Sequence, residues 1–373
     1  MLKFKDVHKA SKGLLGKTKV VTLLCVFSLL ISSNESDACS VFAHKLKDNS
    51  LVVAKNFDWI SGDGYLVVNA RQMQRRSFRE PELFKWVSKY GSISFTTVGP
   101  GLPVSSMNEK GLVVEALVDK DFSGDFSHVN SLLSLEWAQY VLDNFESTDS
   151  VIEFSKKHAF DQVVVALHFF VCDRLGHCAV IESNDSDQSK LDIISDDDLL
   201  FKVLANGDWH KDYNKSQSLQ GMLSAYISKL KFMPSFSSYK RFGTLVSTLK
   251  VGKQLSLSDV FDSLDQAKIV SLIRWQIAWK PNEKVVHWRR YNGYGAGKIQ
   301  RYSTAELSYA CDKKIQVMDL HDFSTNHLRD YKMSDINKVE ERLRKVMYWR
   351  LGGVEKSLAA NLARFTMSSK CVR

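Results

Sequence analysis

The sequence is most informative at first through what it lacks. No apolar run approaches the about 20 residues that a helix needs to span a bilayer. The net charge of +9 is spread along the chain, so the clustered basic footprint of a nucleic-acid-binding protein is missing. No His-Glu-x-x-His pattern occurs, and the glycines of residues 293–297 lack the Lys-Ser/Thr pair of a phosphate-binding loop. These absences argue against a membrane channel, a nucleic-acid-binding protein and a metal- or nucleotide-dependent enzyme, and we expect no cofactor and no metal.

The N-terminus has the three parts of a secretory signal. Six lysines in residues 3–19 precede an apolar run at residues 20–31, and a polar stretch then ends in Ser36 and Ala38, small residues that a signal peptidase reads. We therefore expect residues 1–38 to be a cleaved signal peptide and residues 39–373 to form a single periplasmic or secreted domain. An uncleaved anchor remains the alternative because the basic region is long.

Cysteine usage agrees with export. Cys25 would leave with the signal peptide and Cys39 would begin the mature chain, which leaves an even number of cysteines in an oxidising compartment. Cys172 and Cys178 flank a turn sequence between two apolar strands, so a bridge across that hairpin is sterically reasonable. The sequence leaves open whether the cysteines pair as Cys172–Cys178 and Cys311–Cys371. A zinc site at His177 lacks a second ligand pair.

The pattern of apolar residues predicts many strands with helices between them. Strands are expected at residues 39–44 and 51–57, and the turn between them centres on Asp48 and Asn49, which tolerate a left-handed backbone. Such a hairpin would return Asp58 to Cys39. Further strands are expected at residues 65–70, 92–98, 111–117, 162–172, 178–182, 273–279 and 285–290, and helical segments at 132–145, 149–157, 218–230 and 334–351. This mixture predicts an α+β fold.

Two helix caps follow from the same pattern. Thr148 is expected to cap the helix at residues 149–157, and Ser334 is expected to cap the basic helix that runs to Leu351. No internal repeat, low-complexity linker or shift in composition marks a domain boundary after residue 38.

A cysteine at the start of the mature chain would carry both parts of a catalytic unit. Its α-amino group titrates near pH ~8 and its thiol near ~8.5, so one residue supplies base and nucleophile. Asp58 would orient the amine, Lys55 or Arg241 would lower the thiol pKa, and Asn206 would stabilise a developing oxyanion. Taken singly, each of these residues also fits a solvated or turn position, and a papain-like pairing of Cys39 with a histidine stays open.

Cys39 has two other interpretations, a lipid attachment site and a structural thiol. Lipoprotein signals prefer an apolar residue three positions before the cysteine, where this chain has Ser36. A structural disulfide at Cys39 would leave an odd cysteine elsewhere. The alternative to an enzyme is therefore a non-catalytic lipoprotein or binding protein anchored through Cys39.

Several ordered motifs resemble one family. They are found at residues 39–42, 55–59, 107–112, 137–144, 171–174 and 239–242. With these motifs the chain resembles the choloylglycine hydrolase family of linear-amide hydrolases, which includes bile salt hydrolases and penicillin V acylases. The resemblance implies an N-terminal-nucleophile hydrolase fold, a four-layer αββα sandwich of two antiparallel sheets. It also implies a small-molecule amide substrate, no nucleic acid, no stable membrane insertion after signal cleavage, and leaves a homo-oligomer open.

The resemblance also implies roles for individual residues. Cys39 would attack a non-peptide amide and form an acyl-enzyme, with Asp58 beside its amine, Asn206 in the oxyanion hole and Arg241 near the thiol. We note two departures from the family pattern. Lys55 replaces the arginine of bile salt hydrolases and lacks its bidentate fork.

The second departure is Val118, which replaces the asparagine or tyrosine of those enzymes. Because its side chain cannot donate a hydrogen bond, a backbone N–H would have to serve. The two departures therefore bear on bile-salt specificity rather than on amide hydrolysis itself.

Overall fold

The computed structural model describes the chain from residue 38 onward, with short gaps. The described residues are 38–124, 131–162, 165–187, 189–218, 221, 237–250, 254–292, 295–312, 314–321, 327–351, 356–365 and 367–372. The predicted signal peptide up to residue 37 and most of the 218–230 segment lie outside them. Asp37–Arg373 forms one compact unit.

One large sheet carries the start of the described chain. Its strands follow the order β14-β1-β2-β15-β16-β17, with β18 also paired to β16, and every pair is antiparallel. The strands are β1 (Ala38–Lys45), β2 (Leu51–Asp58), β14 (Val203–Leu204), β15 (Ile273–Lys280), β16 (Val285–Asn292), β17 (Gly295–Ala296) and β18 (Gln300–Ser303). We call this sheet the nucleophile sheet, because β1 contains Cys39, the nucleophile that the sequence predicts.

The second large sheet is also antiparallel throughout and has the order β13-β12-β11-β8-β7-β6-β3-β19-β20. Its strands are β3 (Tyr65–Asn69), β6 (Ser92–Thr96), β7 (Ser105–Asn108), β8 (Val113–Val118), β11 (Leu167–Cys172), β12 (Cys178–Ser183), β13 (Leu191–Ser195), β19 (Gln316–Asp319) and β20 (Arg329–Asp330). Small sheets join β9 (Leu132–Leu133) to β10 (Phe160–Asp161), and β21 (Lys370–Cys371) to β4 (Met73–Arg76) and β5 (Lys85–Val87).

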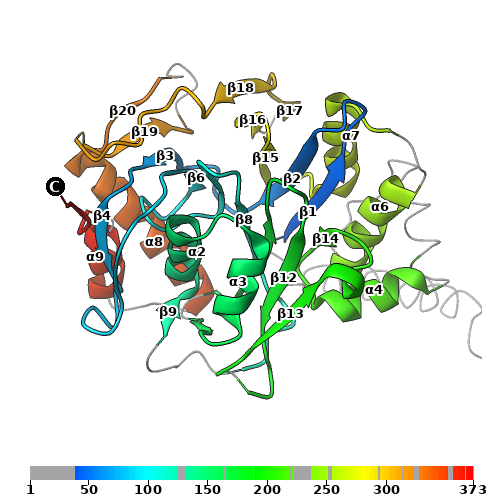
Figure 1. The fold of residues 1–373 in the computed structure, drawn as a ribbon, viewed down its shortest axis with the longest axis horizontal. Coiled ribbons are helices and arrows are strands. Elements are labelled where there is room, and N and C mark those ends of the chain that lie inside the picture. The colour runs from blue at the N-terminus through cyan, green and yellow to red at the C-terminus, as the bar shows by residue number, and fades with distance from the viewer. Residues whose placement is uncertain are drawn as a thin grey trace, which may run out of the picture. The chain divides into compact units, whose positions relative to one another are not determined.

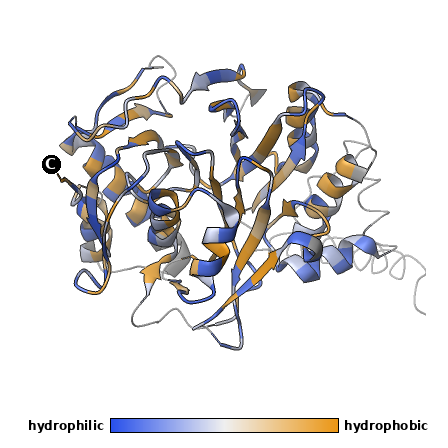
Figure 2. Ribbon diagram, viewed as in Figure 1, coloured by the Kyte–Doolittle hydropathy of each residue, from blue (hydrophilic) through white to orange (hydrophobic). Residues whose placement is uncertain are grey.

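The helices cover the outer faces of the two large sheets. They are α2 (Ser134–Asn144), α3 (Thr148–Ser155), α4 (Trp209–Gln217), α6 (Ser238–Lys250), α7 (Leu257–Ala267), α8 (Met333–Leu351) and α9 (Lys356–Phe365), with a short 3₁₀ turn at Asp196–Asp198. Figure 1 shows α6 and α7 next to β1 and β2, away from α8 and α9. Figure 2 shows α4 as largely hydrophilic, whereas apolar residues concentrate on the central strands.

The alternation of side chains along β8 shows which layer lies on each face of the second large sheet. Val114 and Ala116 belong to a buried cluster with Trp137 of α2, whereas Val113 and Leu117 belong to the core shared with the nucleophile sheet. Because successive side chains of a strand point to opposite faces, β8 packs against helices on one face and against a sheet on the other. This arrangement confirms the predicted α+β class and the four-layer sandwich.

The first hairpin is present as predicted. Asn49 adopts the left-handed backbone conformation with φ of 61°, and the Asp48 carboxylate accepts a hydrogen bond from the Ser50 backbone N–H at 3.0 Å. The resulting register pairs Cys39 with Phe57 and Ala38 with Asp58.

Both predicted helix caps are wrong by one position or more. Ser147 caps α3, accepting a hydrogen bond from the Ser150 N–H, and Thr148 is the first helical residue. Ser334 lies inside α8, which begins at Met333. Neighbouring Ser and Thr residues both suit an N-cap, so tertiary contacts decide between them.

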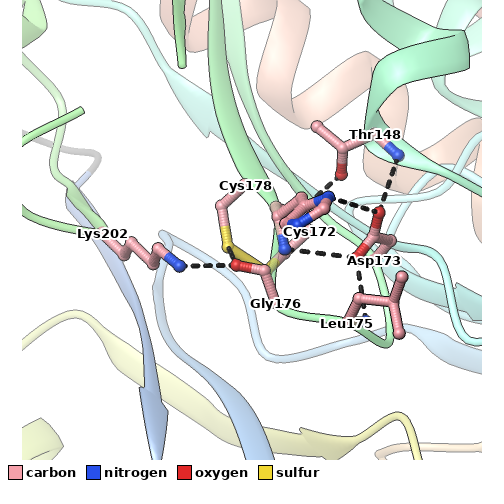
Figure 3. Close-up of a disulfide and its surroundings, with 8 residues drawn as sticks. Thr148, Cys172, Asp173, Leu175, Gly176, Cys178 and Lys202 are labelled. Carbon is pink, nitrogen blue, oxygen red and sulfur yellow. Dashed lines mark hydrogen bonds and ion pairs between the residues drawn. A yellow bond between two sulfur atoms is a disulfide. The ribbon is translucent and has the colours of Figure 1, made fainter. Parts of the chain in front are cut away.

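The structure confirms the disulfide across the β11–β12 hairpin. Cys172 and Cys178 are cross-strand partners with Cα atoms 4.1 Å apart. Figure 3 shows how the intervening turn is held: the Asp173 carboxylate accepts from the Leu175 N–H at 2.9 Å, and Lys202 donates to the Gly176 carbonyl at 2.5 Å. A second disulfide joins Cys311 to Cys371, with a Cα separation of 5.5 Å.

Within the described ranges, no helix combines the length and the apolar composition that crossing a membrane would require.

Candidate active site

Cys39 is the second residue of β1, and its side chain is only 2% exposed. It is the one free cysteine among the described residues. In this chain its nitrogen is still a peptide nitrogen joined to Ala38, which is fully buried in the same strand. The Cys39 nitrogen therefore stands where an α-amine would lie after cleavage between the two residues.

Asp58 lies directly across the hairpin from Ala38 and is fully buried. One carboxylate oxygen, Oδ1, accepts a hydrogen bond from the Ile269 N–H at 3.1 Å. The other, Oδ2, has no hydrogen-bond partner among the residues that the structure describes. Burial raises the pKa of Asp58 to about 7, although the nearby Arg241 guanidinium opposes this rise. Oδ2 is thus free to accept a hydrogen bond that the described part of the uncleaved chain does not supply.

This raised pKa predicts a pH dependence of stability in the uncleaved chain. The pKa of Asp58 rises from 3.8 to about 7 on folding, so the folded state binds the proton more tightly. Its contribution is fully present below about pH 4 and is lost as the pH rises through about 7, a decrease of roughly 4 kcal/mol. Urea unfolding of full-length wild type and Asp58→Asn tests this: the stability difference should change over that window, and parallel pH profiles would contradict the assignment.

Asn206 follows β14, whose pairing with β1 places it next to Cys39. Its side-chain oxygen accepts from the Cys39 backbone nitrogen at 2.6 Å and from Nη2 of Arg241 at 2.6 Å. Its side-chain nitrogen donates to the Val118 carbonyl at 2.7 Å. All three contacts are buried, and together they fix the orientation of the amide.

The beginning of α6 holds Asn206 from two directions. The Ser238 hydroxyl accepts hydrogen bonds from the backbone N–H groups of Asn206 and Gly207, both at 2.7 Å, and it donates to the Asp212 carboxylate. Arg241, one turn later, binds the side chain of Asn206. A Cβ at Gly207 would lie 2.7 Å from an Asp212 oxygen, so any other residue there would displace the Asp212 carboxylate. Ser238 and Asp212 were not predicted from the sequence, in which the glycine at 207 was the signal that a side chain approaches closely there.

Lys55 lies on the same face of the nucleophile sheet as Cys39. Cys39 pairs with Phe57 and Val41 pairs with Lys55, and directly opposite residues share a face. The Lys55 ammonium is fully buried, and it donates to the carbonyls of Val104 and Ala116, each at 2.6 Å.

Glu115, which sequence analysis missed, lies 3.3 Å from the Lys55 ammonium as a buried ion pair. The signal for it was one carboxylate within the apolar run of residues 111–118.

The electrostatic surroundings of the thiol combine opposing effects. Burial raises the pKa of the Cys39 thiol, the positive charges of Lys55 and Arg241 lower it, and the charge of Asp58 raises it. The structure thus places Cys39, Lys55, Asp58, Asn206 and Arg241 close together, and their catalytic roles stay predictions. Among the described residues, no cluster of histidine, cysteine and carboxylate side chains has the arrangement of a metal site.

Val118 takes part through its backbone. Its side chain is buried, and its carbonyl oxygen holds the Asn206 amide. The sequence predicted a backbone N–H donor at this position, and this role stays a prediction. The observed contact uses the carbonyl as an acceptor.

Comparisons with known proteins agree with this site and fold. The model of the family described as linear amide C–N hydrolases, choloylglycine hydrolase family, matches residues 39–222, beginning at the candidate nucleophile. A penicillin V acylase of Pectobacterium atrosepticum is 26% identical over 188 residues, which cover 45% of this chain and 50% of that protein. The match thus spans half the length of this curated relative.

Two solved structures share the fold. Penicillin V acylase from Agrobacterium tumefaciens superposes with a TM-score of 0.63 at 21% identity, covering 79% of this chain and 98% of that one. A variant of conjugated bile acid hydrolase from Clostridium perfringens gives 0.58 at 16% identity, covering 79% and 96%. At this level of identity the two structures show that the chain has the N-terminal-nucleophile hydrolase fold. The family-model match that starts at Cys39 identifies the chain as a member of the choloylglycine hydrolase family of linear amide C–N hydrolases.

Proposed function

We propose that this chain is an exported amidohydrolase that cleaves a linear, non-peptide C–N amide bond through an acyl-enzyme on Cys39. Residues 1–38 act as the signal peptide, and their removal gives Cys39 a free α-amine. The two disulfides support an oxidising compartment, periplasmic or extracellular. The family match beginning at residue 39 supports the same mature N-terminus.

The surroundings of the Cys39 nitrogen carry this proposal. That nitrogen already donates to Asn206 at 2.6 Å, and the unpartnered Asp58 oxygen belongs to the residue opposite Ala38. An α-ammonium has three N–H donors where the peptide has one. Cleavage thus creates donors for Asp58 Oδ2, and the new positive charge opposes the rise of the Asp58 pKa that burial causes.

The chemistry then follows from the groups present. The α-amine takes the proton from the Cys39 thiol, and the sulfur attacks the substrate carbonyl carbon. Negative charge develops on the carbonyl oxygen, for which the second N–H of the Asn206 amide is the donor, since Val118 accepts only one. The α-ammonium returns its proton to the leaving nitrogen as the C–N bond breaks, which leaves a thioester on Cys39.

Water completes the cycle. The α-amine accepts a proton from water as its oxygen attacks the thioester, and the carbon–sulfur bond then breaks to release the acid and restore the thiol. Lys55 and Arg241 supply positive charge that favours the thiolate during attack. The alternative role of Cys39 as a lipid anchor fits less well, because its side chain is 2% exposed.

A panel of amides tests the proposed function. The purified mature chain should release amine from at least one of four classes: bile-acid conjugates, phenoxyacetyl penicillins, N-acyl homoserine lactones and N-acyl lipids. Peptides that carry the same acyl groups in ordinary peptide linkage serve as the control and should not be cleaved. Cleavage of the peptides alone, or of none of these compounds, would contradict the proposal.

A further inference from the structure

A polar cluster lies between the two large sheets. We call it the intersheet cluster and define it as Lys55 of β2, Ser105 of β7, Glu115 of β8 and Trp279 of β15. All four side chains are buried. Glu115 Oε1 accepts from the Ser105 hydroxyl at 2.8 Å and from Trp279 Nε1 at 2.9 Å, and Oε2 lies 3.3 Å from the Lys55 ammonium.

The cluster links the sheets in both directions. The Lys55 side chain extends from β2 of the nucleophile sheet and donates to the carbonyls of Val104 and Ala116, which belong to the second large sheet or directly precede one of its strands. The Glu115 side chain extends from β8 of the second large sheet and accepts a hydrogen bond from Trp279 of the nucleophile sheet. The two carbonyls that bind the ammonium carry no net charge, so Glu115 is the carboxylate that compensates it.

The cluster reaches the nucleophile through Lys55. Three charged groups act on the Cys39 thiol, namely Lys55 and Asp58 from β2 and Arg241 from α6, and Lys55 contributes the largest lowering of its pKa. Glu115 acts on Lys55 from the opposite sheet. Lysine presents one charge on a flexible stem, without the fixed fork of arginine, so its position depends on the groups that bind it.

We propose that Glu115 is a positioning residue that keeps a charged Lys55 ammonium beside Cys39, so that a carboxylate of the opposite sheet controls the reactivity of the nucleophile. This inference rests on the proposed role of Cys39. A buried ammonium that loses its counter-charge either neutralises or moves toward solvent. In both cases Cys39 loses the positive field of Lys55.

The test measures the thiol directly in the mature enzyme. Cys39 is the single cysteine of residues 39–373 outside the two disulfides, so thiolate absorbance as a function of pH, with Cys39→Ser as the blank, reports its pKa. Glu115→Gln keeps an oxygen for Ser105 and Trp279 but removes the charge. It should raise the thiol pKa by about 1, a tenfold loss of thiolate below that pKa, as Lys55→Met should. In the Lys55→Met background, Glu115→Gln should add no further rise.

Asp143→Asn is the matched control. Asp143 is also a buried carboxylate bound by a cation, Arg75 at 2.9 Å, and by a tryptophan, Trp86 at 2.7 Å, but it lies in α2. It should lose comparable stability without changing the thiol pKa. An unchanged or lowered thiol pKa in Glu115→Gln, or equal rises in both backgrounds, would overturn the inference.

If Glu115→Gln does not fold, Glu115→Asp withdraws the charge by one methylene and should raise the thiol pKa by a smaller amount; no rise would equally overturn the inference. Turnover measured in parallel separates the two claims. If Glu115→Gln leaves the thiol pKa unchanged while turnover still depends on Cys39, only the inference about Glu115 is wrong. If Cys39→Ser still turns over the amide, the proposed function is wrong.

Discussion

Replacing Cys39 with alanine is expected to lower kcat/KM for the preferred amide by a factor on the order of 10⁴ or more. The sulfur is the atom that forms the acyl-enzyme, and no other described cysteine is free to replace it. The α-amine, Asn206 and Arg241 remain in this variant, so any residual rate measures binding and oxyanion stabilisation without a nucleophile. The comparison requires the mature chain, with turnover measured on one amide for both proteins.

Ser40→Ala is the control for this substitution. Ser40 is the next residue of β1, is equally buried, and points to the opposite face of the strand. Its Oγ accepts a hydrogen bond from the Asn56 amide nitrogen at 3.5 Å, on the face opposite the Cys39 thiol. Turnover of Ser40→Ala should stay within a few-fold of wild type. If Cys39→Ala retained comparable turnover, Cys39 would not be the nucleophile.

Asn206→Ala is expected to lower kcat by about 10²- to 10³-fold, the usual effect of removing one oxyanion donor. The substitution also removes the acceptor that holds the Cys39 nitrogen and Arg241 Nη2, each at 2.6 Å. We therefore expect the loss to appear in kcat more than in KM. Steady-state kinetics on the amide that the panel identifies measures both constants.

Asn108→Ala separates catalysis from stability. Asn108 is also a buried asparagine, and its side chain donates to the Leu142 and Phe145 carbonyls at 2.9 and 2.7 Å. Its loss should lower the free energy of unfolding, by roughly 1–3 kcal/mol for the groups left unpaired, with kcat nearly unchanged. A similar decrease of kcat in both variants would assign Asn206 a structural role.

The part of the fold set by local patterns could be predicted from the sequence. The turn at Asp48 and Asn49 and the two apolar runs around it define the first hairpin, and its register follows from them. The caps could not be predicted as well. Thr148 is not the cap because its hydroxyl donates to the His177 carbonyl at 2.7 Å and its N–H to Asp173 at 3.2 Å, contacts with a hairpin that follows later in the sequence.

The candidate site also has a part that local sequence predicts and a part that depends on contacts between distant segments. Cys39, Asp58 and Lys55 lie on one hairpin, so their proximity follows from a single turn. Asn206 and Arg241 were candidates by their chemistry, and the family resemblance selected them, since nothing in their local sequence distinguishes them from turn and surface residues.

The supporting groups depend on tertiary packing. Glu115 reaches Lys55 only because two sheets stack, and Ser238 reaches Asn206 only because α6 packs beside β14. No periodicity along the chain encodes either contact. Such residues are found from the structure, where a buried charge or hydroxyl must have a partner.

The central claim is that Cys39 becomes an N-terminal residue that carries the acyl group. Mass spectrometry of the exported chain, before and shortly after mixing with the amide that it cleaves, tests this most directly. We predict a mass corresponding to residues 39–373 with an unmodified N-terminal cysteine, and then a transient increase by the acyl group on the Cys39 peptide. A chain that retains residues 1–38, a diacylglycerol adduct on Cys39, or an acyl group on another residue would contradict the account.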